Sequence, residues 1–341
     1  MEKKNVDWGN LSFSYTATDK RYVSMFKDGA WDDGALIDDP NLVINESGAV
    51  LQYSQTCFEG LKAYETKDGH IVVFRPDLNA ERMYNTAERL EMPPFPKDRF
   101  IEAVKQVVKA NEAWVPPYGS GATLYLRPYM IAYNPLIGVK PAEEYMFRMF
   151  ACPVGPYYKG GATSIKVKIS DFDRAAPHGT GHVKAGLNYA MSLHASEIAH
   201  KEGFAENIFL DPTTRTKIEE AGGANAIFIA EDGTLVVPKS NSILPSITRR
   251  SIVYVAENIL GMKVDEREVY LDEVHNFVEM GLCGTAAVIS PVESINDHGN
   301  EIVFKNNIGT MGPVLKKLYD TLTGIQMGTV EAPEGWIVTI D

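Results

Sequence analysis

The most informative stretch of this sequence is Gly181-His182-Val183-Lys184-Ala185-Gly186-Leu187-Asn188-Tyr189. Its lysine stands between small and flexible residues, just before a segment whose pattern is typical of a helix. Burial lowers the pKa of a lysine and frees its amine to act as a nucleophile toward a carbonyl compound. Most lysines are solvated surface groups, so this stretch alone leaves both interpretations open.

Three further stretches carry residues of chemical interest. In 219–225 (EEAGGAN), two acids precede small residues that let another group approach the backbone, but solvated acids beside a tight turn have the same pattern. In 243–250 (ILPSITRR), Pro and Ser open a helix whose N-terminus offers free N–H groups to a phosphate, although ordinary capped helices look alike. The stretch 284–287 (GTAA) is either a small binding loop with one hydroxyl or a turn before a core strand.

Length and composition indicate a two-domain globular protein. The chain has 341 residues, of which 45% are hydrophobic, and a typical domain has about 100–200 residues. The net charge of −12 opposes binding to nucleic acid or to anionic membranes, because both are negatively charged. We therefore expect neither as a partner.

Cysteine usage and the N-terminal sequence predict a cytoplasmic location. The three cysteines, Cys57, Cys152 and Cys283, are far apart and in no metal-ligand spacing, so neither a disulfide framework nor a zinc site is predicted. The first residues, MEKKNVDWGN, lack the apolar core of a signal peptide. No apolar run approaches the roughly 20 residues of a membrane span.

Periodicity predicts an α+β first half and a mixed α/β second half. The predicted strands are 50–64, 70–74, 122–132, 144–154, 165–169, 207–210, a hairpin over 226–237, and 286–292. The predicted helices are 77–90, 97–114, 188–201, 246–260, 271–280 and 313–322. Gly, Pro and Tyr residues in 156–163 predict a connection between a smaller domain, 1–155, and a larger one, 164–341. No GxGxxG follows a strand, so a Rossmann nucleotide site is not predicted.

Taken together, the motifs strongly resemble those of the branched-chain aminotransferases, which are fold-type IV enzymes that use pyridoxal 5′-phosphate (PLP). They occur in order from about residue 30 onward: 58–64 (FEGLKAY), 74–76 (FRP) with Asn79 and Arg82-Met83, 124–128 (LYLRP), 153–155 (PVG), 184–189 (KAGLNY), 220–222 (EAG), 243–245 (ILP), 283–286 (CGTA) and 319–326 (YDTLTGIQ). The resemblance implies a two-domain α+β fold like that of D-amino-acid aminotransferase. It also implies transfer of the amino group of leucine, isoleucine and valine to 2-oxoglutarate.

The resemblance further implies which residues hold the cofactor. Lys184 would bond covalently to PLP and move a proton between the substrate Cα and the cofactor. Glu220 would keep the ring nitrogen protonated, so that the ring accepts the electrons released at Cα. Arg82 would bind the phosphate as a fork of donors. The other implied cofactor contacts are Tyr189, Gly223, Ala224, Asn225, Leu244, Ile247, Thr248 and Thr285.

The implied partners are amino acids, 2-oxo acids and a second copy of the chain. The residues implied in substrate binding are Tyr53, Phe58, Tyr125, Arg127, Val139, Tyr157, Thr285 and Ala286. Of these, Phe58, Tyr53 and Tyr157 would wall an apolar pocket. Tyr125, Arg127 and the backbone of Thr285-Ala286 would receive carboxylates. Tyr53 and Val139 would reach in from the other subunit, which implies a homodimer with active sites at the subunit interface.

The sequence departs from the family pattern at two places. Ala287 and Ser290 replace the CxxC pair of the animal mitochondrial members, so thiol regulation is not expected. Gly223 replaces a threonine that many members have, which leaves the size of the substrate pocket open. Two other activities remain as alternatives: another fold-type IV enzyme, such as a D-amino-acid aminotransferase or an aminodeoxychorismate lyase, and a catalytically inactive binding module of the same fold.

Overall fold

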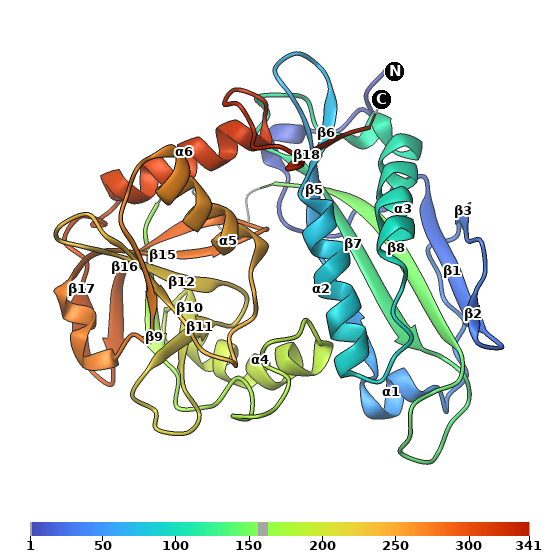
Figure 1. Ribbon diagram of the computed structural model, residues 1–341, viewed down its shortest axis with the longest axis horizontal. Coiled ribbons are helices and arrows are strands. Elements are labelled where there is room, and N and C mark those ends of the chain that lie inside the picture. Colours follow the sequence, from blue (N-terminus) through green and yellow to red (C-terminus); the bar gives the residue numbers. More distant parts are fainter. Residues whose placement is uncertain (1, 156–162, 341) are drawn as a thin grey trace. The chain divides into compact units, whose positions relative to one another are not determined.

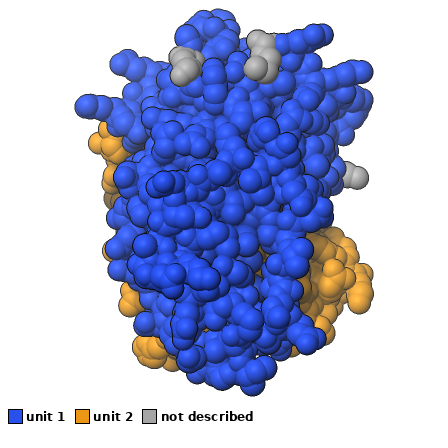
Figure 2. Space-filling model, turned by 90° about the vertical axis from the view of Figure 1, so that its right-hand side faces the viewer, with its two compact units in different colours: residues 1–157, 183–186, 324–341 blue, residues 158–182, 187–323 orange. Residues whose placement is uncertain are grey.

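The structure is a computed structural model that describes residues 2–155 and 163–340. The chain divides into two compact units (Figure 2). Unit 1 comprises Met1–Tyr157, Val183–Gly186 and Gly324–Asp341, and unit 2 comprises Tyr158–His182 and Leu187–Thr323. Among the described residues, no helix is long and apolar enough to cross a membrane.

Unit 1 is built on one antiparallel sheet. Its strands are β1 (Arg21–Lys27), β2 (Ala30–Trp31), β3 (Ala35–Ile37), β4 (Thr56–Phe58), β5 (Leu61–Glu65), β6 (Ile71–Phe74), β7 (Thr123–Ala132), β8 (Tyr145–Val154) and β18 (Ile337–Thr339). The strand order is β18-β6-β5-β7-β8-β1-β2, with β3 on β1 and β4 on β7. The helical segments are η1 (Trp8–Asn10), α1 (Ala49–Tyr53), α2 (Pro76–Arg89), α3 (Lys97–Ala110) and η2 (Glu112–Trp114).

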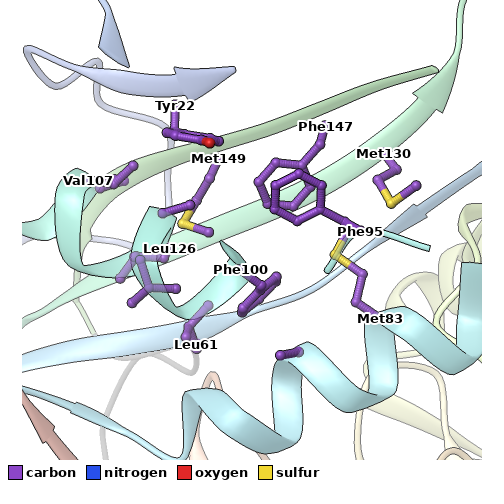
Figure 3. Close-up of a cluster of buried hydrophobic side chains, with 14 of the residues drawn as sticks. Tyr22, Leu61, Met83, Phe95, Phe100, Val107, Leu126, Met130, Phe147 and Met149 are labelled. Atoms are coloured by element: carbon purple, nitrogen blue, oxygen red, sulfur yellow. The ribbon is translucent and has the colours of Figure 1, made fainter. Parts of the chain in front are cut away.

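One face of this sheet carries the hydrophobic core of unit 1, and the other face carries polar and aromatic side chains. Met83 of α2 and Phe100 of α3 are buried in the same cluster as Leu126 of β7 (Figure 3). Successive side chains of a strand point to opposite faces. Tyr125 and Arg127, which flank Leu126 in β7, therefore lie on the face away from that core. The alternation thus leaves the second face of the sheet available for chemistry.

Unit 2 contains a mixed sheet. Its strands are β9 (Ile165–Ile169), β10 (Glu206–Leu210), β11 (Ile218–Ala221), β12 (Asn225–Ala230), β13 (Leu235–Pro238), β14 (Val264–Arg267), β15 (Phe277–Gly284), β16 (Val288–Asp297) and β17 (Asn300–Val303). The order is β11-β10-β9-β16-β15-β12-β13-β14, with β17 on β16. An additional pairing of β11 with β12, at Glu220 and Asn225, closes the strands from β11 to β12 into a ring. The core of unit 2 includes Val167, Ile208, Phe228 and Leu282.

The helical segments of the second half are α4 (Gly186–Lys201), α5 (Ile247–Tyr254), η3 (Val255–Ile259), η4 (Leu271–Asn276) and α6 (Pro313–Gln326) (Figure 1). The segment η3 continues α5 as a single π-helical turn. The α+β character predicted from the sequence is confirmed.

Two predicted elements are wrong in type. Residues 50–64 were expected to form one strand, but Ala49–Tyr53 is helical and β4 and β5 are separated at Glu59-Gly60. There the N–H of Glu59 donates to Pro128 O, and a Cβ at Gly60 would lie 2.0 Å from the hydroxyl of Tyr125, so a larger residue at this bend would displace the Tyr125 ring.

Residues 271–280 were expected to form a helix, but only the 3-10 turn η4 forms, and β15 follows. The strand β15 pairs with β12 on one side and β16 on the other, and these two ladders outweigh the local helical pattern.

The division into units differs from the predicted domain ranges in two segments. Val183–Gly186 groups with unit 1, because Ala185 forms a β-bridge with Cys57. Gly324–Asp341 also groups with unit 1, because β18 pairs with β6. A prediction that divides the sequence at one point does not describe units that are each made of several separate segments. The predicted connection, 156–163, lies outside the described residues except for Thr163, so the predicted boundary stays a prediction.

Candidate active site

Lys184 lies in unit 1 and its backbone is fixed on both sides. Its N–H donates to Thr86 Oγ1 of α2 (3.2 Å), and its carbonyl accepts from the N–H of Phe58 (3.2 Å). The half-buried side chain places Nζ 4.8 Å from the centre of the Phe58 ring. The structure thus brings the predicted catalytic lysine and a predicted substrate-binding aromatic together.

Three predicted substrate residues form a cluster on the second face of the unit 1 sheet. Arg127 donates from Nη2 to the hydroxyl of Tyr125 (3.1 Å), and its guanidinium lies 4.9 Å from the Phe58 ring centre and 5.3 Å from that of Tyr125. Its Nε is buried without a hydrogen-bond partner. A buried N–H of this kind is costly unless a further acceptor is supplied, as a substrate carboxylate would do.

Arg82 of α2 is held by a carboxylate that the sequence reasoning did not single out. Its Nε lies 2.7 Å from Glu59 Oε1, and its Nη2 lies 2.8 Å from Oε2. Asn79 Nδ2, one helical turn before Arg82, also donates to Oε2 (2.6 Å). Glu59 has no exposed surface, and Arg82 is 6% exposed. The pair therefore fixes one edge of the guanidinium in a single orientation.

Glu220 lies at the centre of the predicted cofactor residues of unit 2. Its Oε1 accepts from Leu244 N (2.9 Å) and lies 2.7 Å from Arg174 Nη2, while its Oε2 accepts from Asn225 Nδ2 (2.8 Å). Burial raises the pKa of Glu220 to about 6, and Arg174 is the main group that opposes this rise. The three predicted residues Glu220, Leu244 and Asn225 are thus in direct contact.

Two loops of unit 2 hold the small predicted residues. Gly223 and Ala224 form the turn between β11 and β12, in which Ala221 N donates to Ala224 O (2.8 Å). A Cβ at Gly284 would lie 3.6 Å from Gly223 O, so this turn neighbours the loop that carries Thr285 and Ala286. A Cβ at Gly223 itself would meet no atom within 4 Å, and its backbone is in an ordinary conformation. Neither turn geometry nor packing therefore requires glycine at this position.

The predicted phosphate-binding helix N-terminus is present in unit 2. Ser246 caps α5, and its side chain accepts from Arg249 N. Ile247 and Thr248 are the first two helical residues and are buried. Their N–H groups belong to the first turn, which has no intrahelical acceptors. Tyr189 is half-buried in α4.

The remaining predicted substrate residues are not brought to either cluster. Tyr53 is at the end of α1, and its hydroxyl donates to Ile137 O. Val139 lies in the loop between β7 and β8 and is 85% exposed. Both were expected to act in the other subunit, so their role stays a prediction. Tyr157 lies outside the described residues.

Sequence reasoning missed two buried charged residues, Glu59 and Arg174. Glu59 is part of a quoted motif, and its place between Phe58 and a glycine gave no sign of a charged partner. Arg174 stands in no motif. Lys62, on the same face as Tyr125 because the two are register partners, was also not assigned a role. Burial lowers its pKa to about 8.

Comparison with known proteins gives the family. The model of the family "Amino-transferase class IV" matches residues 56–295. A branched-chain-amino-acid aminotransferase of Haemophilus influenzae is 53% identical over 343 residues, with 99% of this chain and 100% of the relative covered. The solved branched-chain amino acid aminotransferase of Escherichia coli has a TM-score of 0.81 at 26% identity, with coverage of 95% and 100%. That of Thermobaculum terrenum, solved in its PLP form, has a TM-score of 0.79 at 25% identity, with coverage of 96% and 100%.

The chain belongs to the class IV amino-transferases. Within them, the predicted branched-chain aminotransferase activity, the predicted fold class and the predicted PLP cofactor are confirmed by these relationships. They favour this activity over a D-amino-acid aminotransferase or an aminodeoxychorismate lyase.

Proposed function

We propose that this chain transfers the amino group of L-leucine, L-isoleucine and L-valine to 2-oxoglutarate, which gives the branched-chain 2-oxo acids and L-glutamate. Family membership supports the reaction class. The observation that carries the site assignment is the surroundings of Glu220, a buried carboxylate that accepts from Leu244 and Asn225, lies beside the Arg174 cation and keeps acceptor capacity on Oε2.

The surroundings of Glu220 fit the ring nitrogen of PLP. An ionised carboxylate has about four acceptor positions. The hydrogen bonds from Leu244 N and Asn225 Nδ2 use one on each oxygen, and the Arg174 cation lies beside Oε1. The remaining position on Oε2 suits a ring N–H⁺. Burial raises the pKa of Glu220 to about 6, which still leaves the ionised form favoured at pH 7. When bound, PLP accepts the electron pair that is released as the Cα proton leaves.

The surroundings of Lys184 fit a proton carrier. The bonds of its backbone to Thr86 and Phe58 fix the origin of the side chain. The aromatic ring under Nζ excludes water from one side of the amine. In this role, Lys184 Nζ would hold the cofactor covalently in the resting enzyme and would accept the proton from the substrate Cα.

Arg82 and the start of α5 are the proposed phosphate ligands. Glu59 occupies Nε and Nη2 of Arg82, so the orientation of the guanidinium is set before any ligand binds. The first-turn N–H groups of Ile247 and Thr248 supply neutral donors and the positive end of the helix dipole. The hydroxyl of Thr285 completes the proposed set.

Phe58, Tyr125 and Arg127 are proposed to bind both kinds of substrate. The ring of Phe58 offers an apolar wall for a branched side chain. Arg127 offers a cation for the γ-carboxylate of glutamate, and it keeps the hydroxyl and the two rings as partners when leucine is bound. An apolar substrate therefore does not leave the guanidinium without contacts.

We also propose that the enzyme is a cytoplasmic homodimer. The exposed apolar side chains at Leu51, Tyr53, Ile137 and Val139 support a second copy as partner, because such a group on a monomer is unusual. In this assembly, Tyr53 and Val139 approach the substrate of the other subunit.

A panel of L- and D-amino acids with 2-oxoglutarate tests the reaction. We expect turnover with L-leucine, L-isoleucine and L-valine, and little with D-alanine or L-aspartate. Production of glutamate is followed for each donor, and boiled enzyme is the blank. Preference for D-alanine would instead favour a D-amino-acid aminotransferase.

A further inference from the structure

Arg174 makes an unusual set of contacts with a single nitrogen. Its Nη2 lies 2.7 Å from Glu220 Oε1 and donates to the carbonyls of Gly181 and Ser242, both at 2.8 Å. The residue is 5% exposed, and its Nε is buried without a hydrogen-bond partner. This buried cation differs from a surface ion pair, because its removal from water costs free energy that its contacts must offset.

The three residues that Nη2 contacts belong to separate segments of the chain. Glu220 is itself a proposed cofactor residue, and each of the other two shortly precedes one. Gly181 precedes Lys184 by three positions, and Ser242 precedes Leu244 by two. A Cβ at Gly181 would lie 2.4 Å from Ser242 O and 2.9 Å from Arg174 Nη2. The approach of these segments is therefore so close that residue 181 has to be glycine.

The charged groups around Glu220 show why a cation is needed there. Glu219, the neighbour on β11, raises the pKa of Glu220, and burial raises it more. Arg174 lowers it, as do the N–H of Leu244 and, more weakly, Arg249 of α5. Cys283 of β15 is also close to Glu220, and burial raises its pKa to about 12, so it stays neutral. Arg174 is thus the main charge that favours the ionised carboxylate.

We propose that Arg174 is a positioning residue that holds Glu220 ionised, with Oε2 turned toward the ring nitrogen of the cofactor. This inference rests on the proposed role of Glu220. The Arg174 cation and Leu244 N both lie against Oε1, so that oxygen faces the protein. The other oxygen, Oε2, would then face the cofactor, and its negative charge would keep the ring nitrogen protonated.

The protonation state of the ring nitrogen is the direct readout. The full-length chain is loaded with PLP carrying ¹⁵N in the ring, and the ¹⁵N resonance at neutral pH reports whether that nitrogen bears a proton. We expect the protonated position in the wild type and in Arg174→Lys, which keeps a cation. We expect its loss in Arg174→Met and in Arg174→Gln.

Arg174→Gln separates charge from hydrogen bonding, because its amide still donates to backbone carbonyls. If the protonated resonance persists in both Arg174→Gln and Arg174→Met, the cation is not what keeps Glu220 ionised, and the proposal is overturned. Should Arg174→Met fail to fold, the comparison of Arg174→Gln with Arg174→Lys decides alone.

Two controls complete the experiment. Arg215→Met removes a nearby arginine that pairs with Asp173 (2.8 Å) and not with Glu220, so we expect it to keep the protonated resonance. Loss of the protonated resonance in Arg215→Met would mean that any substitution in this region deprotonates the ring nitrogen, which would also overturn the proposal. Glu220→Gln should lose the protonated resonance. A wild-type resonance in Glu220→Gln would contradict the proposed role of Glu220 itself, whereas loss in Glu220→Gln but not in the neutral Arg174 variants would contradict only the role of Arg174.

Discussion

Glu59 and Arg82 form a buried ion pair with two parallel hydrogen bonds, of 2.7 and 2.8 Å, inside unit 1. This pair changes what a substitution of Arg82 is expected to do. A phosphate ligand at the surface could be removed without effect on folding, but removal of Arg82 leaves a carboxylate that has no exposed surface without its cation. Loss of one partner of a buried pair is costly, because the remaining charge is no longer compensated.

We expect Arg82→Ala to lower the free energy of unfolding of the cofactor-free chain by about 3–5 kcal/mol. It should also lose PLP on dialysis against phosphate buffer. Urea unfolding of the apo chain measures the first effect. The matched control is Arg89→Ala, an exposed arginine of the same helix, for which a change below about 1 kcal/mol is expected. Equal stability of the two variants would show that Glu59 does not depend on Arg82.

Lys184→Ala should abolish the covalent link to PLP and nearly all turnover, while the fold is retained. Reduction of the wild type with borohydride and peptide mapping should place the pyridoxyl group on Lys184. Lys62 is the internal competitor, because its amine is buried and its pKa is lowered to about 8. A label on Lys62 would contradict the assignment. Lys201→Ala, at the exposed end of α4, should behave as the wild type.

Arg127→Met should impair the half-reaction with glutamate far more than the half-reaction with leucine. Its guanidinium is the proposed partner of the γ-carboxylate, and removing one partner of a desolvated charge pair costs about 2–5 kcal/mol. Single-turnover rates with each amino acid measure the difference, and the leucine rate in the same variant is the control. Equal losses for both amino acids would mean that Arg127 does not bind the γ-carboxylate.

His298 in the turn between β16 and β17 should give a pH-dependent contribution to stability. Its two ring nitrogens lie 2.7 Å from Asp171 and 2.8 Å from Asp297, and these contacts raise its pKa. A raised folded pKa means that the contribution is fully present below the unfolded pKa, near 6.5, and is lost as the pH rises through the folded pKa.

We expect His298→Gln to lower the thermal midpoint at about pH 5.5, and to have no effect at about pH 9. Because the pair is exposed, the effect should correspond to less than about 1 kcal/mol. His275→Gln, at another exposed histidine, is the control. A difference between His298→Gln and wild type that is the same at both pH values would rule out the charged pair as its cause.

The sequence was sufficient for residues that lie in local patterns. Ser246 caps a helix, and Lys184 stands just before one, so their places at helix starts could be predicted from their neighbours in the chain. The alternation of β7 placed Tyr125 and Arg127 on one face, and the structure has them in contact.

The rest depends on partners that are distant in the sequence. Arg174 reaches Glu220 across α4 and β10, and it reaches Ser242 across α4 and the strands β10 to β13. No period or motif connects these residues. Glu59 pairs with a cation from α2, and the pattern of the residues around it, between β4 and β5, contains no sign of one. The helical pattern of 271–280 failed for the same reason, since the ladders to β12 and β16 decide its structure.

The position of β18 has a consequence for synthesis of the chain. Its residue Val338 pairs with Val73 of β6, which lies more than three quarters of the chain length earlier. At a rate of about 5–20 residues per second, β6 waits on the order of tens of seconds on the ribosome before its partner emerges. During that time one edge of the apolar strand β6 has no partner strand. We therefore expect the nascent chain to be more prone to association through this edge than the completed protein.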